Sequence, residues 1–296
     1  MDARIGIIGY GEAGQAFAHG LCSNKKISVS VFDIRFNDEK ISQSLISKAK
    51  QQGLIVERDV GSLVLNNDII LSVVTSEVAT KVVEDALPFI KEGKVYVDMN
   101  TVSPRVKILM SELIEARGGS FVEVAILGTI ASYGFKSPVL ACGKKADEVA
   151  NFLRNMGFDV TFLSEEIGKA SYMKMLRSVF AKGVEALLIE MLLGAKRCDL
   201  MEPLMDAIVK HMDKTSFQEI ANTWITTNVL HGKRRADEME HVIETLKELK
   251  VKPTVSEAVR DRLKSVSELG LKDFFKGKKP ADYRDVINAM VEMGYS

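Results

Sequence analysis

The sequence predicts an α/β fold in which a doubly wound, mostly parallel sheet is followed by an all-helical C-terminal domain. Two observations lead to this prediction. Short apolar runs of the β type alternate with amphipathic stretches through the first half of the chain, which is typical of a parallel sheet covered by helices. After about residue 163 no strand-like run appears, and helical periodicity rich in Met, Leu and Ala continues to the end. We therefore expect one domain over residues 1–163 and a second over residues 164–296.

The expected strands of the first domain are short and separated by helical stretches or turns. The run at 68–74, DIILSVV, is apolar throughout, as expected for a strand that helices cover on both faces. Ser103 and Pro104 open the helix after the fifth strand, because Ser is a good N-cap and Pro suits the first turn. The expected strand segments are 4–8, 27–34, 53–56, 68–74, 94–99, 120–126, 138–142 and 159–163.

The second half begins with a helix of unusual length, expected at 165–197. Helical periodicity then continues with breaks at residues that disfavour a helix interior. The expected breaks lie near Asp199, His231-Gly232, Lys252-Pro253 and Gly270.

Composition excludes several classes of protein. The 296 residues carry 40 basic and 40 acidic side chains, so net charge favours neither nucleic acid nor a membrane surface as a partner. Three scattered cysteines and four histidines form neither a disulfide framework nor a metal site. No stretch reaches the ~18–20 uninterrupted apolar residues of a membrane span, and we expect a soluble cytoplasmic protein.

A glycine-rich loop follows the first expected strand directly and opens a helix. Its sequence, Gly9-Tyr10-Gly11-Glu12-Ala13-Gly14, matches GxGxxG, the fingerprint of a Rossmann dinucleotide site when it stands between a strand and a helix. Gly9 permits the tight turn, Gly11 lets the backbone approach a pyrophosphate, and Gly14 allows close packing of helix on strand. We expect all six loop residues to contact a dinucleotide whose phosphates lie at the helix N-terminus.

Asp33 ends the second expected strand, about 20 residues after this loop. An acid at that place hydrogen-bonds the adenosine ribose hydroxyls and repels a 2′-phosphate, which favours NAD. Arg35 could accept that phosphate if Asp33 turned away, so NADP remains an alternative. The other reading of Arg35 is a surface residue after a strand.

The carboxyl ends of the fourth and fifth expected strands hold further candidates, because ligands bind at that edge of open α/β sheets. Val74 and Thr75 end the fourth strand, and their backbone is expected to line the cofactor. Asn100 and Thr101 follow the fifth strand. We expect Asn100 to contact the nicotinamide ribose or the substrate, and Thr101 to contact the substrate. The alternative for Asn100 is a residue of the turn into the next helix.

Four segments in this order resemble the β-hydroxyacid dehydrogenase superfamily, which includes 6-phosphogluconate and 3-hydroxyisobutyrate dehydrogenases. The resemblance covers nearly the whole chain. It is closest to a small phosphogluconate-dehydrogenase-like branch. That branch shares the motif K-M-L-R-S and the pattern at 231–239, which reads HGKRRADEM here. The four segments are IGIIGYGEAGQAFA (5–18), VDMNTVSPRVKILM (97–110), EVAILGTIASYGFKSPVLACG (123–143) and GKASYMKMLRS (168–178).

The resemblance implies a catalytic lysine at Lys174, acting as general acid and base on an alcohol or carbonyl. Helical spacing places Arg177 and Ser178 on the same face. There Arg177 could lower the pKa of Lys174 and hold a carboxylate or phosphate bidentately. From periodicity alone, the alternative is a lysine and an arginine on the wet face of an amphipathic helix.

The sequence also departs from the family pattern. The family's loop serine falls on Leu127, while Gly128 is retained and Thr129 replaces the second glycine. The family's asparagine pair becomes Arg177-Ser178, and the glutamate that assists 6-phosphogluconate dehydrogenases falls on Ala181. We therefore do not expect oxidative decarboxylation of 6-phosphogluconate.

Two more groups are candidate substrate contacts. The loop at 128–132, with Gly128 and Thr129, could present backbone N–H groups to an anion. His231 and Arg235 could cap the site from the helical domain, and a basic helix surface is the alternative reading of both.

The sequence therefore predicts an oxidoreductase that transfers a hydride between NAD(P) and the CH–OH or C=O of a small anionic 3-hydroxyacid-type substrate. One alternative is an imine- or opine-type reductase, against which the retained Lys174 argues, because such reductases usually replace that lysine. A non-catalytic NAD(P)-binding regulator is the other alternative, to which the lost loop serine and asparagine pair give weight. The resemblance further implies a homodimer through the C-terminal helical domain.

Overall fold

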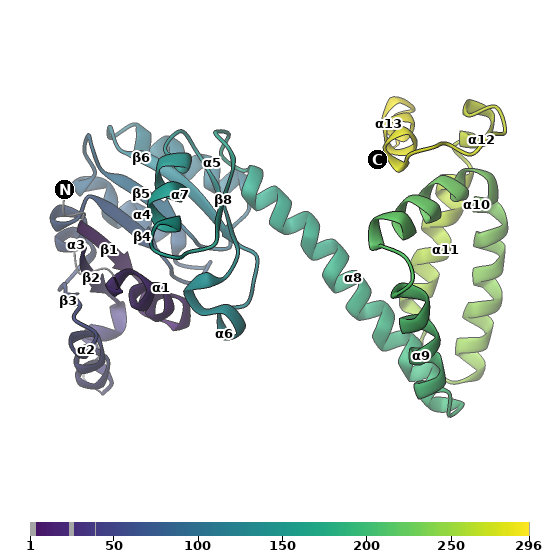
Figure 1. The fold of residues 1–296 in the computed structure, drawn as a ribbon, viewed down its shortest axis with the longest axis horizontal. Coiled ribbons are helices and arrows are strands. Elements are labelled where there is room, and N and C mark those ends of the chain that lie inside the picture. Colours follow the sequence, from purple (N-terminus) through teal and green to yellow (C-terminus); the bar gives the residue numbers. More distant parts are fainter. Residues whose placement is uncertain (1–3, 24–26, 39, 296) are drawn as a thin grey trace. The chain divides into compact units, whose positions relative to one another are not determined.

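The chain forms two compact units in a computed structural model that describes residues 4–23, 27–38 and 40–295 (Figure 1). Contacts between Cα atoms group Met1–Ser178 in the first unit and Val179–Ser296 in the second. The division falls inside helix α8 (Lys169–Arg197). The last strand ends at Ser164, so the first turns of α8 belong to the same unit as the sheet.

The first unit is built on one eight-stranded sheet with the order β3-β2-β1-β4-β5-β6-β7-β8. The strands from β1 to β6 are parallel, and β7 runs antiparallel to β6. The predicted α/β fold with a doubly wound, mostly parallel sheet is confirmed. The strands are β1 (Arg4–Ile8), β2 (Ser28–Phe32), β3 (Ile55–Val56), β4 (Ile69–Ser72), β5 (Val95–Asp98), β6 (Ser120–Ile126), β7 (Val139–Cys142) and β8 (Val160–Ser164).

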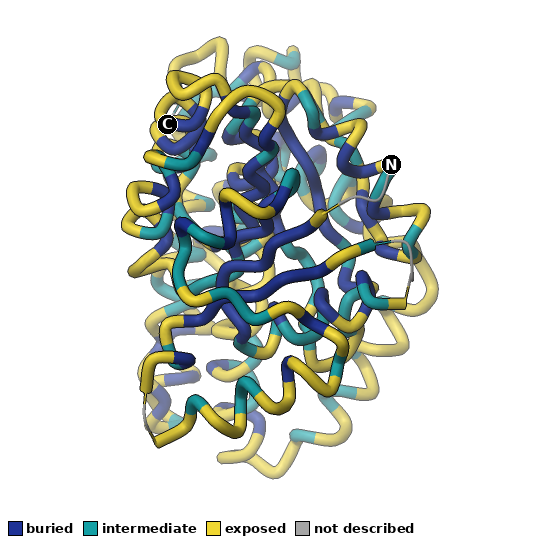
Figure 2. Tube along the Cα trace, turned by 90° about the vertical axis from the view of Figure 1, so that its left-hand side faces the viewer, coloured by how far each residue is buried: buried dark blue, intermediate teal, exposed yellow. Residues whose placement is uncertain are grey.

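Helices connect these strands and cover the sheet. The α-helices are α1 (Glu12–Cys22), α2 (Ser42–Gln51), α3 (Val60–Asn66), α4 (Ala79–Ala86), α5 (Pro104–Glu115), α6 (Ile130–Tyr133) and α7 (Ala146–Arg154). Ser103 accepts a hydrogen bond from the Val106 amide at the start of α5, where the sequence predicts this N-cap. After their first residues, the central strands β1, β4 and β5 are buried, as the dark segments of Figure 2 show.

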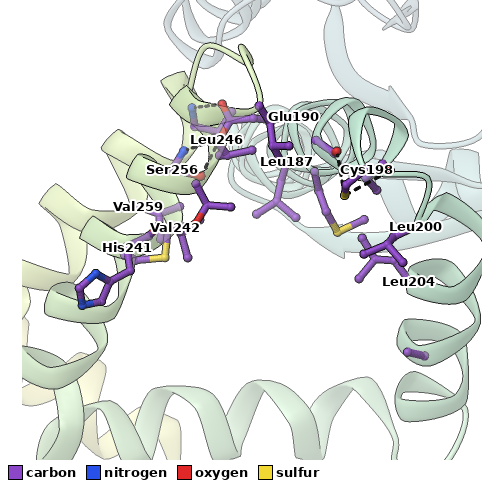
Figure 3. A pocket seen from close by; sticks show the side chains of 18 of the residues that line it. Leu187, Glu190, Cys198, Leu200, Leu204, His241, Val242, Leu246, Ser256 and Val259 are labelled. Carbon is purple, nitrogen blue, oxygen red and sulfur yellow. Dashed lines mark hydrogen bonds between the residues drawn. The ribbon is translucent and has the colours of Figure 1, made fainter.

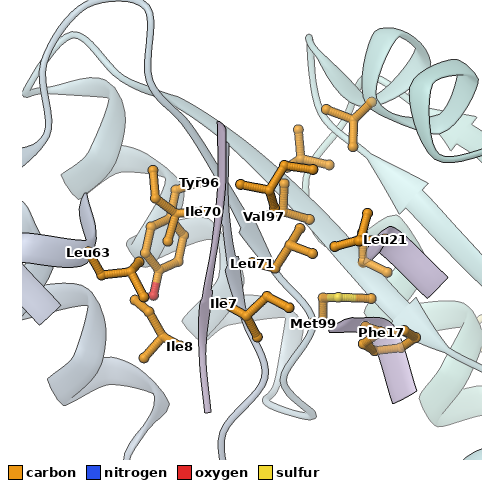
Figure 4. Close-up of a cluster of buried hydrophobic side chains, with 14 of the residues drawn as sticks. Ile7, Ile8, Phe17, Leu21, Leu63, Ile70, Leu71, Tyr96, Val97 and Met99 are labelled. Carbon is orange, nitrogen blue, oxygen red and sulfur yellow. The ribbon is translucent and has the colours of Figure 1, made fainter. Parts of the chain in front are cut away.

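The hydrophobic core lies on both faces of the sheet, because side chains alternate along each strand. Successive residues of the central strands point to opposite sides (Figure 4). One face carries Ile8, Ile70 and Tyr96 toward Leu63 of α3, and the other carries Ile7, Leu71 and Val97 toward Phe17 and Leu21 of α1. A sheet apolar on both faces explains why its strands are continuous apolar runs in the sequence.

One row of paired residues breaks this apolar pattern. Ser72, Asp98, Glu123 and Cys142 are aligned across β4, β5, β6 and β7, and all four are fully buried. Paired residues of neighbouring strands point to the same face, so two buried carboxyl groups lie side by side. This polar row lies near the carboxyl ends of β4 and β5.

The second unit is helical, as predicted, and contains the later part of α8 with α9 (Met201–Met212), α10 (Phe217–Glu248), α11 (Thr254–Ser267), α12 (Leu271–Phe274) and α13 (Tyr283–Glu292). The breaks predicted near Asp199, Lys252-Pro253 and Gly270 fall between helices. Asp199 and Gly270 have positive φ values of 56° and 75°. Within the described parts of the chain, no helix is both long and apolar enough to cross a bilayer.

Two predicted helix boundaries are wrong. The break at His231-Gly232 does not exist, because α10 runs without interruption from Phe217 to Glu248. Gly232 is instead a packing glycine: a Cβ placed on it would lie 3.2 Å from Cβ of Ser267 in α11. The long helix begins at Lys169 and not at 165, because Gly168 has φ +100° and cannot continue a right-handed helix.

Candidate functional site

The glycine loop between β1 and α1 has the geometry of a dinucleotide site. Gly9 has φ +101°, and a Cβ placed there would lie 2.2 Å from the carbonyl oxygen of Val73. A Cβ on Gly14 would lie 2.0 Å from the carbonyl oxygen of Gly9, so only glycine allows α1 to pack this closely. Gly11 has open space where a Cβ would stand. Since no described side chain caps α1 at Gly11, its first amides can bind an anion.

Only part of the loop faces the ligand side. The Tyr10 ring is fully buried and packs on Phe36 with ring centroids 6.0 Å apart. Its hydroxyl donates to Oε1 of Gln52 at 2.6 Å, so Tyr10 takes part in the site through its backbone. Glu12 is exposed in the first turn of α1.

Asp33 directly follows β2 and forms a compact network with the loop. Its carboxylate accepts from the Tyr10 amide at 2.6 Å and from the Arg35 amide at 2.9 Å. The Arg35 guanidinium adds two hydrogen bonds of 2.8 Å. Burial alone would raise the pKa of Asp33, but the hydrogen bonds from Arg35 and Tyr10 outweigh it and lower that pKa. Asp33 is therefore a carboxylate at neutral pH.

A cavity of about 790 Å³ lies along this loop at the carboxyl edge of the sheet. It is lined by most of the predicted cofactor contacts and by Thr101, a predicted substrate contact: the cofactor contacts in the lining are Gly9, Gly11, Ala13, Asp33, Arg35, Val74, Thr75 and Asn100. The sequence alone did not predict that α4 and the residue before it line one side of this cavity. The lining residues there are Val78, Lys81, Val82 and Asp85, and the i, i+4 spacing of the two valines after the fourth strand was the available signal.

Asn100 joins the ends of β4 and β5. Its Oδ1 accepts from the Val74 amide at 2.6 Å, and its Nδ2 donates to Ser72 at 2.9 Å and to Asp98 at 2.5 Å. Asp98 in turn forms a fully buried ion pair with Lys107 of α5, whose Nζ also donates to the Asp98 carbonyl at 3.0 Å. Asn100 lines the cavity, but protein groups already engage both ends of its amide.

Lys174 lies one turn into α8 and points to the same edge of the sheet. Its Nζ donates to Oγ1 of Thr101 at 2.7 Å, and Thr101 lines the cavity. The side chain is half-buried. Burial, and after it the positive charge of Lys107, lowers the pKa of Lys174. A lowered pKa makes this amine a better proton acceptor near neutral pH than an exposed lysine.

Arg177 and Ser178 make contacts that the sequence does not predict. Arg177 Nη1 donates to the carbonyl oxygen of Leu127 at 2.7 Å, the position on which the family's loop serine falls. Ser178 Oγ donates back to the Lys174 carbonyl at 3.0 Å. The loop itself is compact, because a Cβ on Gly128 would lie 2.7 Å from Ser137 Oγ. Thr129 Oγ1 donates to Ser132 at 2.8 Å.

His231 and Arg235 lie on α10 in the second unit. The Arg235 guanidinium donates to the Trp224 carbonyl at 3.0 Å and to Thr227 Oγ1 at 2.8 Å, both on the same helix. His231 is exposed. Their contact with a substrate stays a prediction.

The second unit has a cavity of its own, of about 810 Å³, among α8, α9, α10 and α11 (Figure 3). Most of its lining is Leu, Val, Ala and Met. Glu190 at its rim accepts from the amides of Val255 at 2.7 Å and Ser256 at 2.9 Å, and so caps the N-terminus of α11. This cavity is apolar and carries no lysine or arginine.

Glu123 is a buried polar group that the sequence alone did not single out. It lies in β6 with no exposed surface and accepts from the amides of Gly168 at 2.5 Å and Ser171 at 2.7 Å. The signal was present, since one acid interrupts the apolar run SFVEVAI. Among all the described residues, no group of three or more His, Cys, Asp or Glu side chains could hold a metal ion.

Comparison with known proteins agrees with this geometry. The model of the NAD binding domain of 6-phosphogluconate dehydrogenase matches residues 4–164, and a domain of unknown function, DUF1932, matches residues 195–266. A conserved hypothetical protein from Sinorhizobium meliloti 1021 is 31% identical, with 99% of this chain and 97% of that chain covered and a TM-score of 0.64.

Two further solved structures are similar. One is MTH1747, a conserved protein of unknown function described as structurally similar to 3-hydroxyacid dehydrogenases. It is 31% identical, the match covers 90% of this chain and 99% of that chain, and the TM-score is 0.61. An imine reductase from Myxococcus stipitatus in complex with NADP+ shares the fold at 15% identity, with 90% and 95% covered and a TM-score of 0.74. The chain belongs to the family that carries the NAD-binding domain of 6-phosphogluconate dehydrogenase, as its resemblance to β-hydroxyacid dehydrogenases predicts.

Proposed function

We propose that this protein is an NAD(P)-dependent oxidoreductase that interconverts the CH–OH and C=O of a small anionic 3-hydroxyacid-type substrate, with Lys174 as general acid and base. The observation that carries the proposal is the contact between Lys174 and Thr101 at 2.7 Å, because Thr101 lines the cavity that the glycine loop and Asp33 also line. An amine of lowered pKa thus lies beside a dinucleotide site.

The reaction needs a group that carries the hydride and a group that carries the proton, and the protein provides the second. When bound, the nicotinamide ring accepts or donates the hydride. In oxidation Lys174 Nζ takes the hydroxyl proton, and in reduction it returns a proton to the carbonyl oxygen. Thr101 Oγ1 accepts a hydrogen bond from this amine, and the buried charge of Lys107 favours the neutral form of the amine.

An anionic substrate is supported by the cation next to Lys174. Arg177 uses Nη1 for the Leu127 carbonyl, and its guanidinium carries further donors that suit a carboxylate or phosphate. The same contact tethers the loop of Gly128 and Thr129, whose backbone amides are candidate partners for the same anion.

We propose NAD as the preferred cofactor. The Asp33 carboxylate is negative and lines the same cavity as Gly11, where it would accept hydrogen bonds from ribose hydroxyls and repel a 2′-phosphate. Arg35 is the group that could reverse this preference, and its guanidinium is engaged by Asp33.

We also propose a homodimer through the helical unit. Support comes from large apolar side chains that α8 leaves exposed after residue 178, among them Phe180 at 54%, Ile189 at 56% and Leu193 at 53% exposed. Burying such surface is the common reason for association. Light scattering after size exclusion should give twice the chain mass, and Ile189→Glu should lower it while Lys196→Glu does not.

The test is a cofactor-reduction screen of small hydroxy acids and phosphorylated sugar acids, with NAD and NADP in parallel and cyclic imines as a second substrate set in the reductive direction. For any substrate found, Lys174→Ala should lower turnover by about 10²–10⁴-fold and leave NADH affinity unchanged. The matched control is Lys169→Ala, since Lys169 lies on the same helix and pairs with Glu166 at 3.4 Å. Turnover of imines alone, or full activity of Lys174→Ala, would contradict the proposal.

A further inference from the structure

Helix α8 begins at a residue that cannot cap it. Gly168 precedes the first helical residue, Lys169, and has φ +100°, a conformation that Ser, Thr, Asp and Asn rarely adopt. A helix start leaves its first amides without partners inside the helix. Because Gly168 has no side chain, another element must satisfy them.

Glu123 of β6 provides this cap. One of its carboxylate oxygens accepts from the Gly168 amide at 2.5 Å, and the other accepts from the Ser171 amide at 2.7 Å. In an ordinary capping box these two amides are satisfied by two side chains of the helix itself. Here a single carboxylate, 45 and 48 residues away in sequence, satisfies both, and its charge complements the positive end of the helix.

We propose that Glu123 is a positioning residue for Lys174, because its carboxylate fixes the start of α8 on β6 and thereby holds the Lys174 amine at Thr101. The inference rests on the proposed function of Lys174. Lys174 lies three residues after Ser171, one of the two residues that Glu123 binds. A shift or rotation of the first turn would therefore move the amine directly.

The same row of buried acids fixes the other side of the contact. Glu123 is aligned with Asp98 across β5 and β6. Asp98 pairs with Lys107 and accepts a hydrogen bond from Asn100. Asn100 directly precedes Thr101 in the chain. Two neighbouring carboxyl groups thus fix the two backbone segments whose side chains meet at the site: Glu123 fixes the start of α8, and Asp98 fixes the end of β5. Ala170, fully buried against Cys142 and Leu140, adds apolar packing to the Glu123 side.

The experiment compares Glu123→Gln with Glu190→Gln. Glu190 is a matched control, because it is also a buried carboxylate that accepts from two amides at a helix start, that of α11. Gln keeps the size but places an amide N–H against a backbone N–H. The readout is the pH dependence of trace acetylation of Lys174 by acetic anhydride, followed by mass spectrometry of the peptide. This readout needs no substrate.

We expect Glu123→Gln to move the titration of Lys174 toward that of an exposed lysine, while Glu190→Gln leaves it unchanged. Lys107 of α5, whose positive charge also lowers the pKa of Lys174, and Arg177, three residues further along α8, are the same in both variants. NADH affinity should stay within about twofold of wild type, and turnover on any substrate found should fall by about 10²-fold through misplacement of the amine.

An unchanged Lys174 titration in folded Glu123→Gln would overturn the inference. If that variant does not fold, Glu123→Asp keeps the charge and shortens its reach by one methylene, and the same two outcomes apply to it. A shifted titration together with full turnover of Lys174→Ala would leave the positioning role intact and reject the proposed chemistry of Lys174. The two failures are therefore distinguishable.

Discussion

Lys174 Nζ and Thr101 Oγ1 lie 2.7 Å apart, which joins the helix of the proposed acid/base to the carboxyl end of β5. Thr101→Val removes this hydrogen bond and keeps the side-chain shape. We expect turnover to fall by about tenfold, the value of one hydrogen bond near 1.4 kcal/mol, with NADH affinity unchanged. Steady-state kinetics measure this. Thr245→Val, which removes a hydroxyl bonded to the His241 carbonyl on α10, is the control that should retain full turnover.

Lys174→Met should make the protein more stable at neutral pH. Burial lowers the pKa of Lys174 in the folded chain, so the unfolded chain binds the proton more tightly and stability rises with pH through this window. At a pH below both pKa values, the full free-energy cost of burying the protonated amine is present, and Met removes this cost. We expect a melting temperature about 1–3 °C higher at pH 7. The gain should shrink as pH rises from the lowered pKa of the folded chain and should vanish above the ordinary lysine pKa of about 10.4. A lower melting temperature at pH 7, with Lys169→Met unchanged, would contradict this.

Lys107→Met should destabilise the protein strongly. It leaves the Asp98 carboxylate without its partner in a place where both side chains are fully buried. The expected loss in free energy of unfolding is about 3–5 kcal/mol, measured by urea denaturation. The double variant Asp98→Asn/Lys107→Met removes both charges and should recover most of this loss. Equal destabilisation in single and double variants would show that packing, and not the unpaired charge, sets the cost.

Asp33 and Arg35 should have opposite effects on the choice of cofactor. Asp33→Ser removes the acceptor for the ribose hydroxyls and frees Arg35 from its contacts at 2.8 Å. We expect NADH affinity to fall by about tenfold or more, as for a hydrogen bond to a charged group, and NADPH affinity to hold or improve. Arg35→Ser should weaken NADPH and spare NADH. Fluorescence titration with both cofactors measures the ratio, and an Arg35→Ser variant that loses mainly NADH affinity would contradict the assignment.

Features governed by local sequence could be predicted from it. The strands are apolar runs because helices cover both faces, and the turn at Gly9 needs a residue that tolerates φ +101°. Both constraints act over a few residues and leave a readable pattern. The approach of Asp33 to the loop follows from the same short unit, since the Tyr10 amide that it accepts from lies 23 residues earlier.

Contacts between distant segments could not be predicted. Glu123 appears in the sequence as one acid in an apolar strand, and its partners at Gly168 and Ser171 become visible only when α8 is placed on β6. Lys107 is similar, because periodicity does not distinguish a buried, paired lysine from an exposed one. Gly232 led to a wrong prediction for the same reason. The glycine suggested a helix break, but it is there because α11 packs closely against it.

The continuity of α8 limits how this protein can exchange parts in evolution. The chain passes from the sheet unit to the helical unit between Ser178 and Val179, inside a helix that runs from Lys169 to Arg197. A recombination event at that point would join two half-helices, and any insertion not a multiple of a helical turn would rotate every later side chain of α8 about its axis. Sheet and helical units of relatives should therefore be inherited together, or be exchanged at loops outside α8.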